Sequence, residues 1–206
     1  MKPRVFIVDD HEAVLRALEC ALPILMPCVI VGVARNAADA LREIPRLKPD
    51  VLWADVCLPE IDGPNLLRLL KVRDVHLGRV LCTGAASDAW IREAMLVEPE
   101  GFVSKYDEMG CWRKALESAS QGGSYCSPRI AEAKKCAPDK ALAKLTDMER
   151  VMFSLAVQNK KKEDIAERLG ISTHTARHHR EHLMAKLGAH SGVDLCKIAL
   201  RAGLME

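Results

Sequence analysis

Residues Pro49–Gly63, PDVLWADVCLPEIDG, decide the fold of the first half of the chain. The apolar run Val51–Ala54 has the length of a buried strand, and it delivers the carboxylate of Asp55 at its C-terminal end. Pro59 and Gly63 then turn the chain before the next helix. Because an open parallel sheet binds its ligands at the C-terminal edge of the strands, we expect Asp55 to lie where chemistry takes place.

A second pair of carboxylates is expected at the same edge. Asp9 and Asp10 directly follow the apolar run Val5–Val8, which also has the length of a buried strand. Carboxylates that converge repel one another, and a hard cation with oxygen ligands relieves that repulsion. The sequence therefore predicts a Mg²⁺ site formed by Asp9, Asp10 and Asp55.

Residues 1 to about 120 alternate strand-like and helix-like segments, which is typical of a doubly wound α/β fold with a five-stranded parallel sheet. The first helix is expected to stop at Pro23, and Asn36 and Ser87 are expected to cap the second and fourth helices. The expected strands are 4–8, 28–34, 51–54, 79–83 and 101–104.

The pattern changes after this α/β part. Residues 121–124 break the alternation, and 122–144 are interpreted as a linker with room for one helix. Residues 145–206 are wholly helical in pattern, and Thr146 with Glu149 predicts a capping box at their start. Gly170–Ser172 is a three-residue turn between two helices, which indicates a helix-turn-helix in an all-α domain of four helices. The expected domains are therefore 1–121 and 145–206.

Composition and charge limit the class of protein. The 206 residues are 49% hydrophobic and 28% charged, as in ordinary globular proteins. No apolar run approaches the roughly 18 residues of a membrane span, and acidic residues come too early for a secretory signal, so we expect a cytoplasmic protein without a membrane partner. Residues 1–120 carry 15 Lys/Arg against 18 Asp/Glu, whereas 121–206 carry 15 against 10, which suggests a polyanionic partner for the second part.

Two further side chains are expected beside the carboxylates. Thr83 ends the fourth expected strand and Lys105 follows the fifth, so both lie at the same sheet edge. A carboxylate, a metal, a hydroxyl and a lysine suit phosphoryl transfer, because the cations neutralise the oxygens of the transferred group. The product would be an aspartyl phosphate on Asp55, which is labile and suits a timed signal.

This arrangement resembles the receiver domain of two-component response regulators, over residues 1 to about 120. The resemblance implies that Asp55 accepts a phosphoryl group from a sensor histidine kinase, with Mg²⁺ as cofactor. It also implies that Asp9, Asp10, Asp55 and the backbone carbonyl of Cys57 bind the metal. The family's hydroxyl switch falls on Thr83, its lysine on Lys105 and its aromatic switch on Phe102. The chain departs from the family's usual residues at Gly84, Tyr106 and Phe102, but none of these changes removes a reacting group.

A helix-turn-helix lays its second helix in the major groove of DNA, and the N-terminal residues of that helix reach base edges. Here Ala176, Leu183 and Leu187 mark the buried side of that helix at helical spacing. The polar residues left on the other side, together with the lysines before the preceding helix, are expected to contact double-stranded promoter DNA. The expected DNA contacts are Lys160, Lys161, Lys162, Thr173, Thr175, Arg177, His178, His179 and Arg180.

Residues 145–187 resemble the LuxR-type helix-turn-helix of the NarL/FixJ class of response regulators. The matching residues are Leu145, Thr146, Glu149, Lys162, Ile165, Ala166, Leu169, Ile171, Ser172, Thr175, His179, Lys186 and Leu187. The resemblance implies a phosphorylation-dependent homodimer whose contact lies in the last helix, at Val193, Leu195, Cys196 and Leu200. The implied function is a transcriptional response regulator.

Other interpretations remain open at this point. The chain could bind DNA constitutively, or under redox control through Cys57 or Cys82, although most of the eight cysteines are expected to be small apolar fillers. His174, His178 and His182 recur every four residues, so a metal site there competes with contacts to phosphate. No dinucleotide-binding glycine motif, Walker loop or Ser-His-Asp arrangement is present, so we expect no independent enzyme beyond hydrolysis of its own phosphoryl group.

Overall fold

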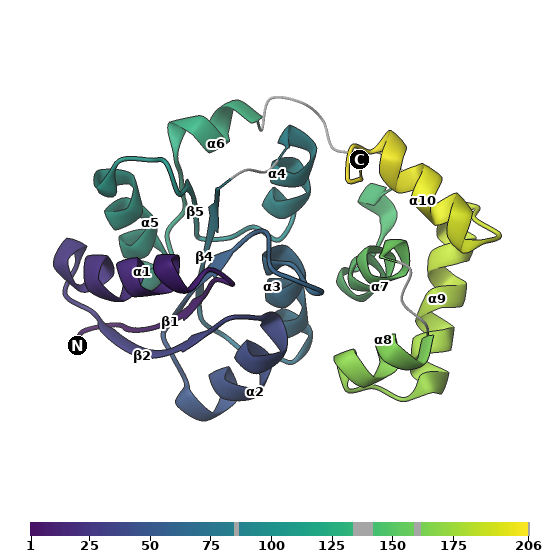
Figure 1. Ribbon diagram of the computed structural model, residues 1–206, viewed down its shortest axis with the longest axis horizontal. Coiled ribbons are helices and arrows are strands. Elements are labelled where there is room, and N and C mark those ends of the chain that lie inside the picture. Colours follow the sequence, from purple (N-terminus) through teal and green to yellow (C-terminus); the bar gives the residue numbers. More distant parts are fainter. Residues whose placement is uncertain (85–86, 134–141, 159–161, 206) are drawn as a thin grey trace. The chain divides into compact units, whose positions relative to one another are not determined.

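The computed structural model describes residues 1–84, 87–133, 142–158 and 162–205, apart from the side chains of 162 and 163. The chain forms two compact units, Met1–Cys136 and Ala137–Glu206. Figure 1 labels the elements along the chain. In chain order they are β1 (Arg4–Val8), α1 (Glu12–Leu25), β2 (Val29–Ala34), α2 (Ala37–Leu47), β3 (Val51–Asp55), α3 (Gly63–Val72), β4 (Gly78–Thr83), α4 (Asp88–Met95), β5 (Gly101–Ser104), α5 (Met109–Gln121), β6 (Tyr125–Cys126), α6 (Pro128–Ala133), a short 3-10 turn (Leu142–Lys144), α7 (Asp147–Val157), α8 (Lys162–Leu169), α9 (Thr173–Leu187) and α10 (Gly192–Arg201).

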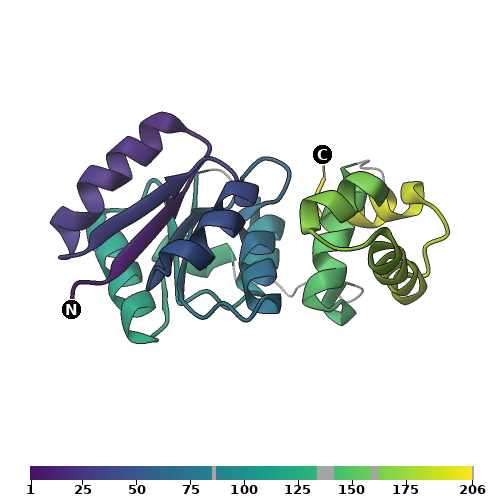
Figure 2. The same ribbon diagram turned by 90° about the horizontal axis from the view of Figure 1, so that it is seen from below.

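The first unit is built on a parallel sheet with the strand order β2-β1-β3-β4-β5-β6. Helices α1 and α5 cover one face of this sheet, and α2, α3 and α4 cover the other (Figures 1 and 2). Alternate strand residues point to opposite faces, so Ile7, Trp53 and Val103 pack with Leu18 and Leu116 in the core beneath α1 and α5. Each fully buried side chain of this size contributes roughly 1.5–3 kcal/mol. The doubly wound α/β fold predicted from the sequence is confirmed.

One helix continues past the proline that was expected to end it. The prediction that the first helix stops at Pro23 is wrong, because α1 contains Pro23 and runs to Leu25. Its last turn is still closed by a bond from the Met26 N–H to the Leu22 carbonyl, and Leu22 is fully buried. In the same way, α2 contains Pro45 and ends at Leu47. Burial of the apolar side chains near the helix ends outweighs the one hydrogen bond that each proline removes.

Residues 122–144 were expected to form a linker with room for one helix. A helix, α6, is present there, but the described residues from α5 through α6 belong to the first unit. The Tyr125 N–H donates to the Glu100 carbonyl and the Ser127 N–H to that of Phe102, which adds β6 as a sixth strand beside β5. Helix α6 follows, and its Ile130 is fully buried. The sheet therefore has six strands where five were expected. A two-residue strand is too short to give a periodic pattern in the sequence.

The second unit is helical, as expected from residue 145 onward. Thr146 and Glu149 form the predicted capping box at the start of α7, and Ser172 caps α9. Gly170 has φ of 65°, a left-handed conformation that lets the chain turn sharply between α8 and α9. Fully buried Val151, Ile165 and Leu183 come from three different helices of the unit. No described helix in either unit is both long and apolar enough to cross a membrane.

Glu149 also links the start of α7 to the end of α9, because Lys186 of α9 donates to its carboxylate at 2.7 Å. Burial acts to raise the pKa of Glu149, but the bonds from Lys186 and Thr146 outweigh that effect and lower the pKa. A lowered pKa means that the carboxylate stabilises the fold above its unfolded pKa and that this stabilisation is lost as the pH falls through the folded pKa.

We therefore expect Glu149→Gln to lower the free energy of unfolding of the second unit at pH 7 by about 1 kcal/mol, since the lysine end of the pair is partly solvated. The difference from the wild type should shrink as the pH falls below 4.5, the ordinary pKa of this group. All three tryptophans, Trp53, Trp90 and Trp112, lie in the first unit. Amide hydrogen exchange of α7 and α9 is therefore the measurement, with exposed Glu167→Gln on α8 as the control. An equal loss of protection in both variants would contradict the assignment.

Candidate functional site

Acidic side chains gather at the C-terminal edge of β1 and β3. Asp55 is the last residue of β3, and Asp9 and Asp10 directly follow β1. Ligand atoms of Asp9, Asp10, His11 and Asp55 all lie within 4.8 Å of one another. Asp9 and Asp55 are only 1% and 3% exposed, so solvent water stabilises their negative charges only weakly. The convergence of three carboxylates that the sequence predicted is present.

Lys105 lies between the two buried carboxylates. Its Nζ is 2.6 Å from Asp9 Oδ2 and 3.2 Å from Asp55 Oδ2. The parallel register of β4 and β5 positions it, because the Lys105 N–H donates to the carbonyl of Thr83 at 2.8 Å. Burial acts to lower the pKa of Lys105, but Asp9 and Asp55 outweigh burial and raise it, so the lysine stays cationic.

One side of Asp55 has no hydrogen-bond partner. Its Oδ1 is buried and unpaired, and the buried hydroxyl of Thr83 is unpaired too, within the part of the chain that the structure describes. Burial raises the pKa of Asp55, the lysine opposes this, and repulsion from Asp9 adds to it. Unpaired buried polar atoms are costly, so a bound group that pairs with them would stabilise this edge. The donor set of carboxylate oxygens fits a hard cation such as Mg²⁺.

His11 also contributes to this cluster, and it was not among the site residues that the sequence predicted. Its Nδ1 lies 2.8 Å from Asp10 Oδ1 and 3.3 Å from Asp9 Oδ1, and its backbone N–H donates to Asp9 Oδ1. The signal was its position directly after the acidic pair, where the chain turns into α1.

The loop from β3 to α3 is held close to Asp55. The Gly63 N–H donates to the carbonyl of Val56 at 3.0 Å, and a Cβ at Gly63 would clash with the backbone carbonyl of Asp55. Asp62 caps α3 by accepting the Asn65 N–H. The glycine is therefore required by the close approach of two backbone segments. Cys57, whose carbonyl was expected to bind the metal, lies in this loop with its side chain exposed.

The aromatic residue predicted for this site and the two cysteines considered for redox control lie close to it in the sequence. Phe102 is 1% exposed within β5 and fills the core. Cys82 is buried, and burial raises the pKa of its thiol. The pKa of Cys57 is raised as well, first by desolvation and then by the charges of Asp55 and Asp62. Because the thiolate is the reactive form of cysteine, the buried environment of Cys82 opposes a redox role for that residue.

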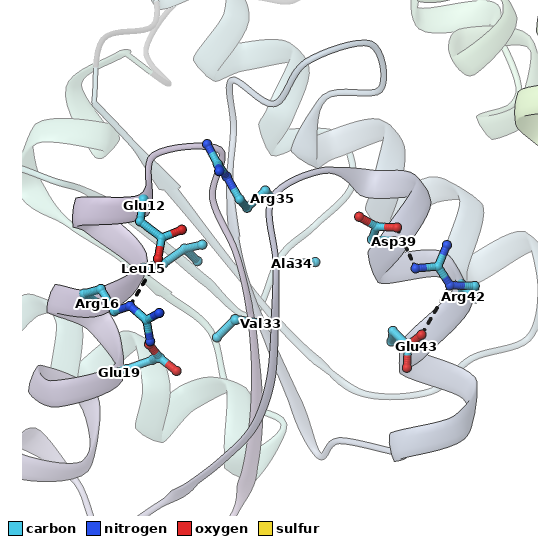
Figure 3. Close-up of a pocket in the computed structure, with 10 residues that line it drawn as sticks. All are labelled: Glu12, Leu15, Arg16, Glu19, Val33, Ala34, Arg35, Asp39, Arg42 and Glu43. Carbon is cyan, nitrogen blue, oxygen red and sulfur yellow. Dashed lines mark hydrogen bonds and ion pairs between the residues drawn. The ribbon is translucent and has the colours of Figure 1, made fainter.

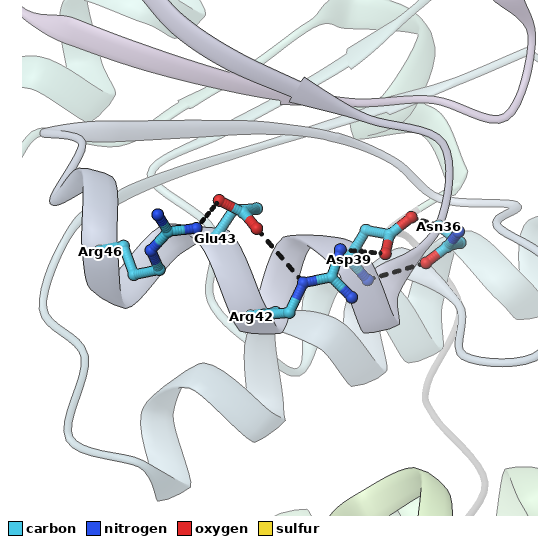
Figure 4. Close-up of polar contacts among 5 residues, drawn as sticks. All are labelled: Asn36, Asp39, Arg42, Glu43 and Arg46. Atoms are coloured by element: carbon cyan, nitrogen blue, oxygen red, sulfur yellow. Dashed lines mark hydrogen bonds and ion pairs between the residues drawn. The ribbon is translucent and has the colours of Figure 1, made fainter.

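A groove of about 370 Å³ lies elsewhere, at the free edge of the sheet, where Val33 and Ala34 of β2 lie between α1 and α2 (Figure 3). Arg16 pairs with Glu12 and Glu19 on its α1 side. On the α2 side the polar groups also pair with one another, as Figure 4 shows for Asn36, Asp39, Arg42, Glu43 and Arg46. Most charged side chains of this groove are therefore paired with one another, and none of the predicted site residues lies in it.

The helix-turn-helix of the second unit presents polar side chains along α9. Ala176 and Leu183 are buried, as expected, whereas Leu187 is half-buried. Arg177 and His178 are exposed. Of the other residues expected to contact DNA, Thr173 is exposed, and Thr175, His179 and Arg180 are half-buried. Lys160 and Lys161 lie outside the described residues, and Lys162 is described in its backbone alone.

Comparison with known proteins decides the family. Residues 5–116 match the response regulator receiver domain, and residues 143–199 match the luxR family of bacterial regulatory proteins. This chain is a response regulator of the NarL/FixJ class. It is 32% identical to the DNA-binding transcriptional activator DevR/DosR of Mycobacterium tuberculosis over 191 residues, which cover 90% of this chain and 88% of the relative. It is 28% identical to the response regulator GacA of Pseudomonas aeruginosa over 210 residues, with 98% of each chain covered.

Solved structures share the fold of this response regulator. The RcsB response regulator of Salmonella typhimurium matches with a TM-score of 0.60 and 21% identity, over 97% of this chain and 99% of that one. A structure of two RcsB dimers bound to two parallel DNAs matches with a TM-score of 0.62 and 22% identity, over 96% and 97% of the two chains.

The burial of residues in the last helix of this response regulator, α10, changes part of the expected dimer contact. Val193 and Leu200 of α10 are 62% and 50% exposed and are free to contact another molecule. Leu195 is fully buried in the core of its own unit, so its assignment to an exposed dimer contact is wrong. Cys196 is half-buried, and its sulfur lies 3.9 Å from the Val157 carbonyl. A helix that packs one face on its own domain offers only the opposite face to a partner.

Proposed function

We propose that Asp55 of this response regulator accepts a phosphoryl group from a partner sensor histidine kinase, and that this event controls binding of promoter DNA in the cytoplasm. The observation that carries the proposal is the unpaired, buried Oδ1 of Asp55. The other oxygen of this carboxylate, Oδ2, lies 3.2 Å from the Lys105 ammonium, and Asp55 shares one cluster with Asp9 and Asp10. A carboxylate oxygen without a partner is free to act as a nucleophile, and a nearby fixed cation favours charge that develops on a transferred group.

Asp9, Asp10, Asp55 and the backbone carbonyl of Cys57 would hold Mg²⁺. The fit rests on three carboxylates whose ligand atoms already lie within 4.8 Å of one another. When bound, Mg²⁺ would supply positive charge that offsets the negative charge of the carboxylates and of the phosphoryl oxygens.

The residues of this chain then divide the work of phosphoryl transfer. A P–O bond forms to Asp55 Oδ1 while the P–N bond to the histidine of the kinase breaks, and the bonding electrons return to that imidazole. Lys105 neutralises one phosphoryl oxygen, and the Thr83 hydroxyl, unpaired before the reaction, donates to another. Later attack by water on phosphorus releases inorganic phosphate and restores Asp55, so the domain hydrolyses its own phosphoryl group.

The new charge is expected to bias two arrangements of Thr83 and Phe102 and so to shift the face formed by α4, β5 and α5. DevR/DosR is a DNA-binding transcriptional activator, and RcsB has been solved as dimers on DNA. By analogy, we propose that phosphorylation favours a homodimer of this chain through exposed Val193 and Leu200, so that two α9 helices meet two half-sites.

The test is incubation of the full chain with Mg²⁺ and acetyl phosphate, followed by intact mass and by DNA binding. We expect one phosphoryl adduct in the wild type, none in Asp55→Ala, and an unchanged adduct in the control Asp74→Ala, whose carboxylate is exposed. Tighter DNA binding should accompany the adduct. An adduct that persists in Asp55→Ala would refute the assignment of Asp55. Equal DNA binding by the wild type and Asp55→Ala would instead support constitutive binding.

Removal of Mg²⁺ gives a separate prediction. Because burial and Asp9 raise the pKa of Asp55, its ionised form is disfavoured in the fold, and Asp55→Asn should stabilise the metal-free first unit by roughly 1 kcal/mol at pH 7. That gain should shrink as the pH falls through the raised pKa of Asp55, where the wild-type carboxyl is neutral too. Mg²⁺ at a hundred times its dissociation constant should add about 2.7 kcal/mol to the wild type and less to the variant. Urea unfolding followed by tryptophan fluorescence measures both effects, and a metal-free variant less stable than the wild type would contradict the sign.

A further inference from the structure

Histidines recur along the exposed side of α9 at the spacing of one helical turn. His174, His178 and His182 are all exposed. The ring centroids of His178 and His182 are 4.1 Å apart, with 54° between the ring planes. Neither ring has a hydrogen-bond or ion-pair partner among the residues that the structure describes. Side chains four residues apart lie on the same face of a helix, so the helix backbone places both rings on one side of α9.

We propose that His178 and His182 form a chelating site for a divalent transition-metal ion such as Zn²⁺. Two imidazoles at positions i and i+4 of a helix place their nitrogens on one face, which is the arrangement by which helices bind Zn²⁺ through paired histidines. Imidazole suits Zn²⁺, Ni²⁺ and Cu²⁺ and is a poor ligand for Mg²⁺, so this site differs in preference from the carboxylate cluster around Asp55.

The surroundings of the pair leave room for the other positions of a metal ion. His174 lies one turn before His178, and exposed Glu181 lies three residues after it, so both neighbour the pair on the helix surface. Glu181 also directly precedes His182 in the sequence. Water would complete the coordination, as in sites that keep open positions.

The location of the histidine pair on α9 implies that a bound metal ion affects DNA binding. This effect rests on the proposed function. His178 is adjacent to Arg177 on the exposed side of α9, the side proposed to face DNA. A hydrated metal ion on His178 and His182 would fill space that the DNA must occupy and would tie up the His178 ring. Occupancy of the site should therefore weaken DNA binding without any change at Asp55.

Metal binding is tested first, without DNA. The full chain is titrated with Zn²⁺ by calorimetry in excess Mg²⁺, which fills the carboxylate cluster, and in a reductant that does not bind metal. We expect His178→Gln and His182→Gln each to lose one Zn²⁺ equivalent or to bind it at least about tenfold more weakly, because a chelate needs both rings. His190→Gln, which changes a single exposed histidine outside α9, should match the wild type. Identical isotherms for the wild type and His182→Gln would overturn the site.

DNA binding is measured separately, by fluorescence anisotropy with a labelled mixed-sequence duplex at low salt. Zn²⁺ should weaken binding by the wild type and by His190→Gln but not by His182→Gln. An equal effect of Zn²⁺ on all three proteins would overturn the competition. If the metal-free wild type fails to bind any duplex, the proposed DNA-binding function fails, whereas the calorimetric result on the histidine pair stands by itself.

Discussion

Gly63→Ala should destabilise the first unit by roughly 3 kcal/mol, because the added methyl group meets backbone atoms that have no room to move away. The Cβ would clash with the carbonyl oxygen of Asp55, at the end of a central strand. Relief of that clash requires movement of β3 or of the whole β3–α3 loop. Either movement displaces Asp55 itself, so the yield of the acetyl phosphate adduct should fall together with the stability.

Gly110→Ala is the matched control for this prediction. Gly110 lies in the first turn of α5, and a Cβ there would have nothing within 4 Å. Alanine is favoured over glycine in a helix by up to about 1 kcal/mol, so the control should be neutral or slightly stabilised. Urea unfolding followed by tryptophan fluorescence measures both variants. A Gly63→Ala protein as stable as Gly110→Ala would show that the loop tolerates displacement and that the glycine is not required by packing.

Arg177→Ala should weaken DNA binding about ten- to a hundredfold, the effect of losing one arginine contact to a base or phosphate. Arg177 is exposed near the start of α9, the part of a recognition helix that reaches base edges. The side chain is not part of the core, so the stability of the second unit should be unchanged.

Arg201→Ala serves as the comparison for charge alone, since Arg201 is also exposed but lies at the end of α10. It should reduce affinity only slightly through the general electrostatic attraction to DNA. Anisotropy titrations at several salt concentrations separate the two effects. Equal losses in both variants would show that α9 has no special role in the contact.

The position of Asp55 could be predicted from the sequence because three simple rules agree there. An apolar run of strand length, a turn after it and the ligand-binding edge of a parallel sheet all point to the same residue. Thr83 and Lys105 could be predicted in the same way, since Thr83 ends a strand and Lys105 directly follows one. The N-caps Asn36 and Ser87 were predictable because capping depends on a few local residues.

Other features depend on tertiary contacts that local patterns do not carry. The continuation of α1 through Pro23 reflects burial of Leu22, which outweighs a local helix-breaking signal. The contact of His11 with the acidic pair depends on side-chain directions at the start of α1. The burial of Leu195 did leave a signal, because Leu195 and Ala199 are spaced as one apolar face of α10.

The hydrogen bonds from β6 to β5 bear on how the receiver is best produced in isolation. A truncated protein that ends at Gln121 would leave the outer side of β5 without the partners it has in Tyr125 and Ser127. An uncovered sheet edge is a template for pairing with other molecules and for aggregation. A fragment extended to Cys136 would retain both β6 and α6 and so keep that edge capped.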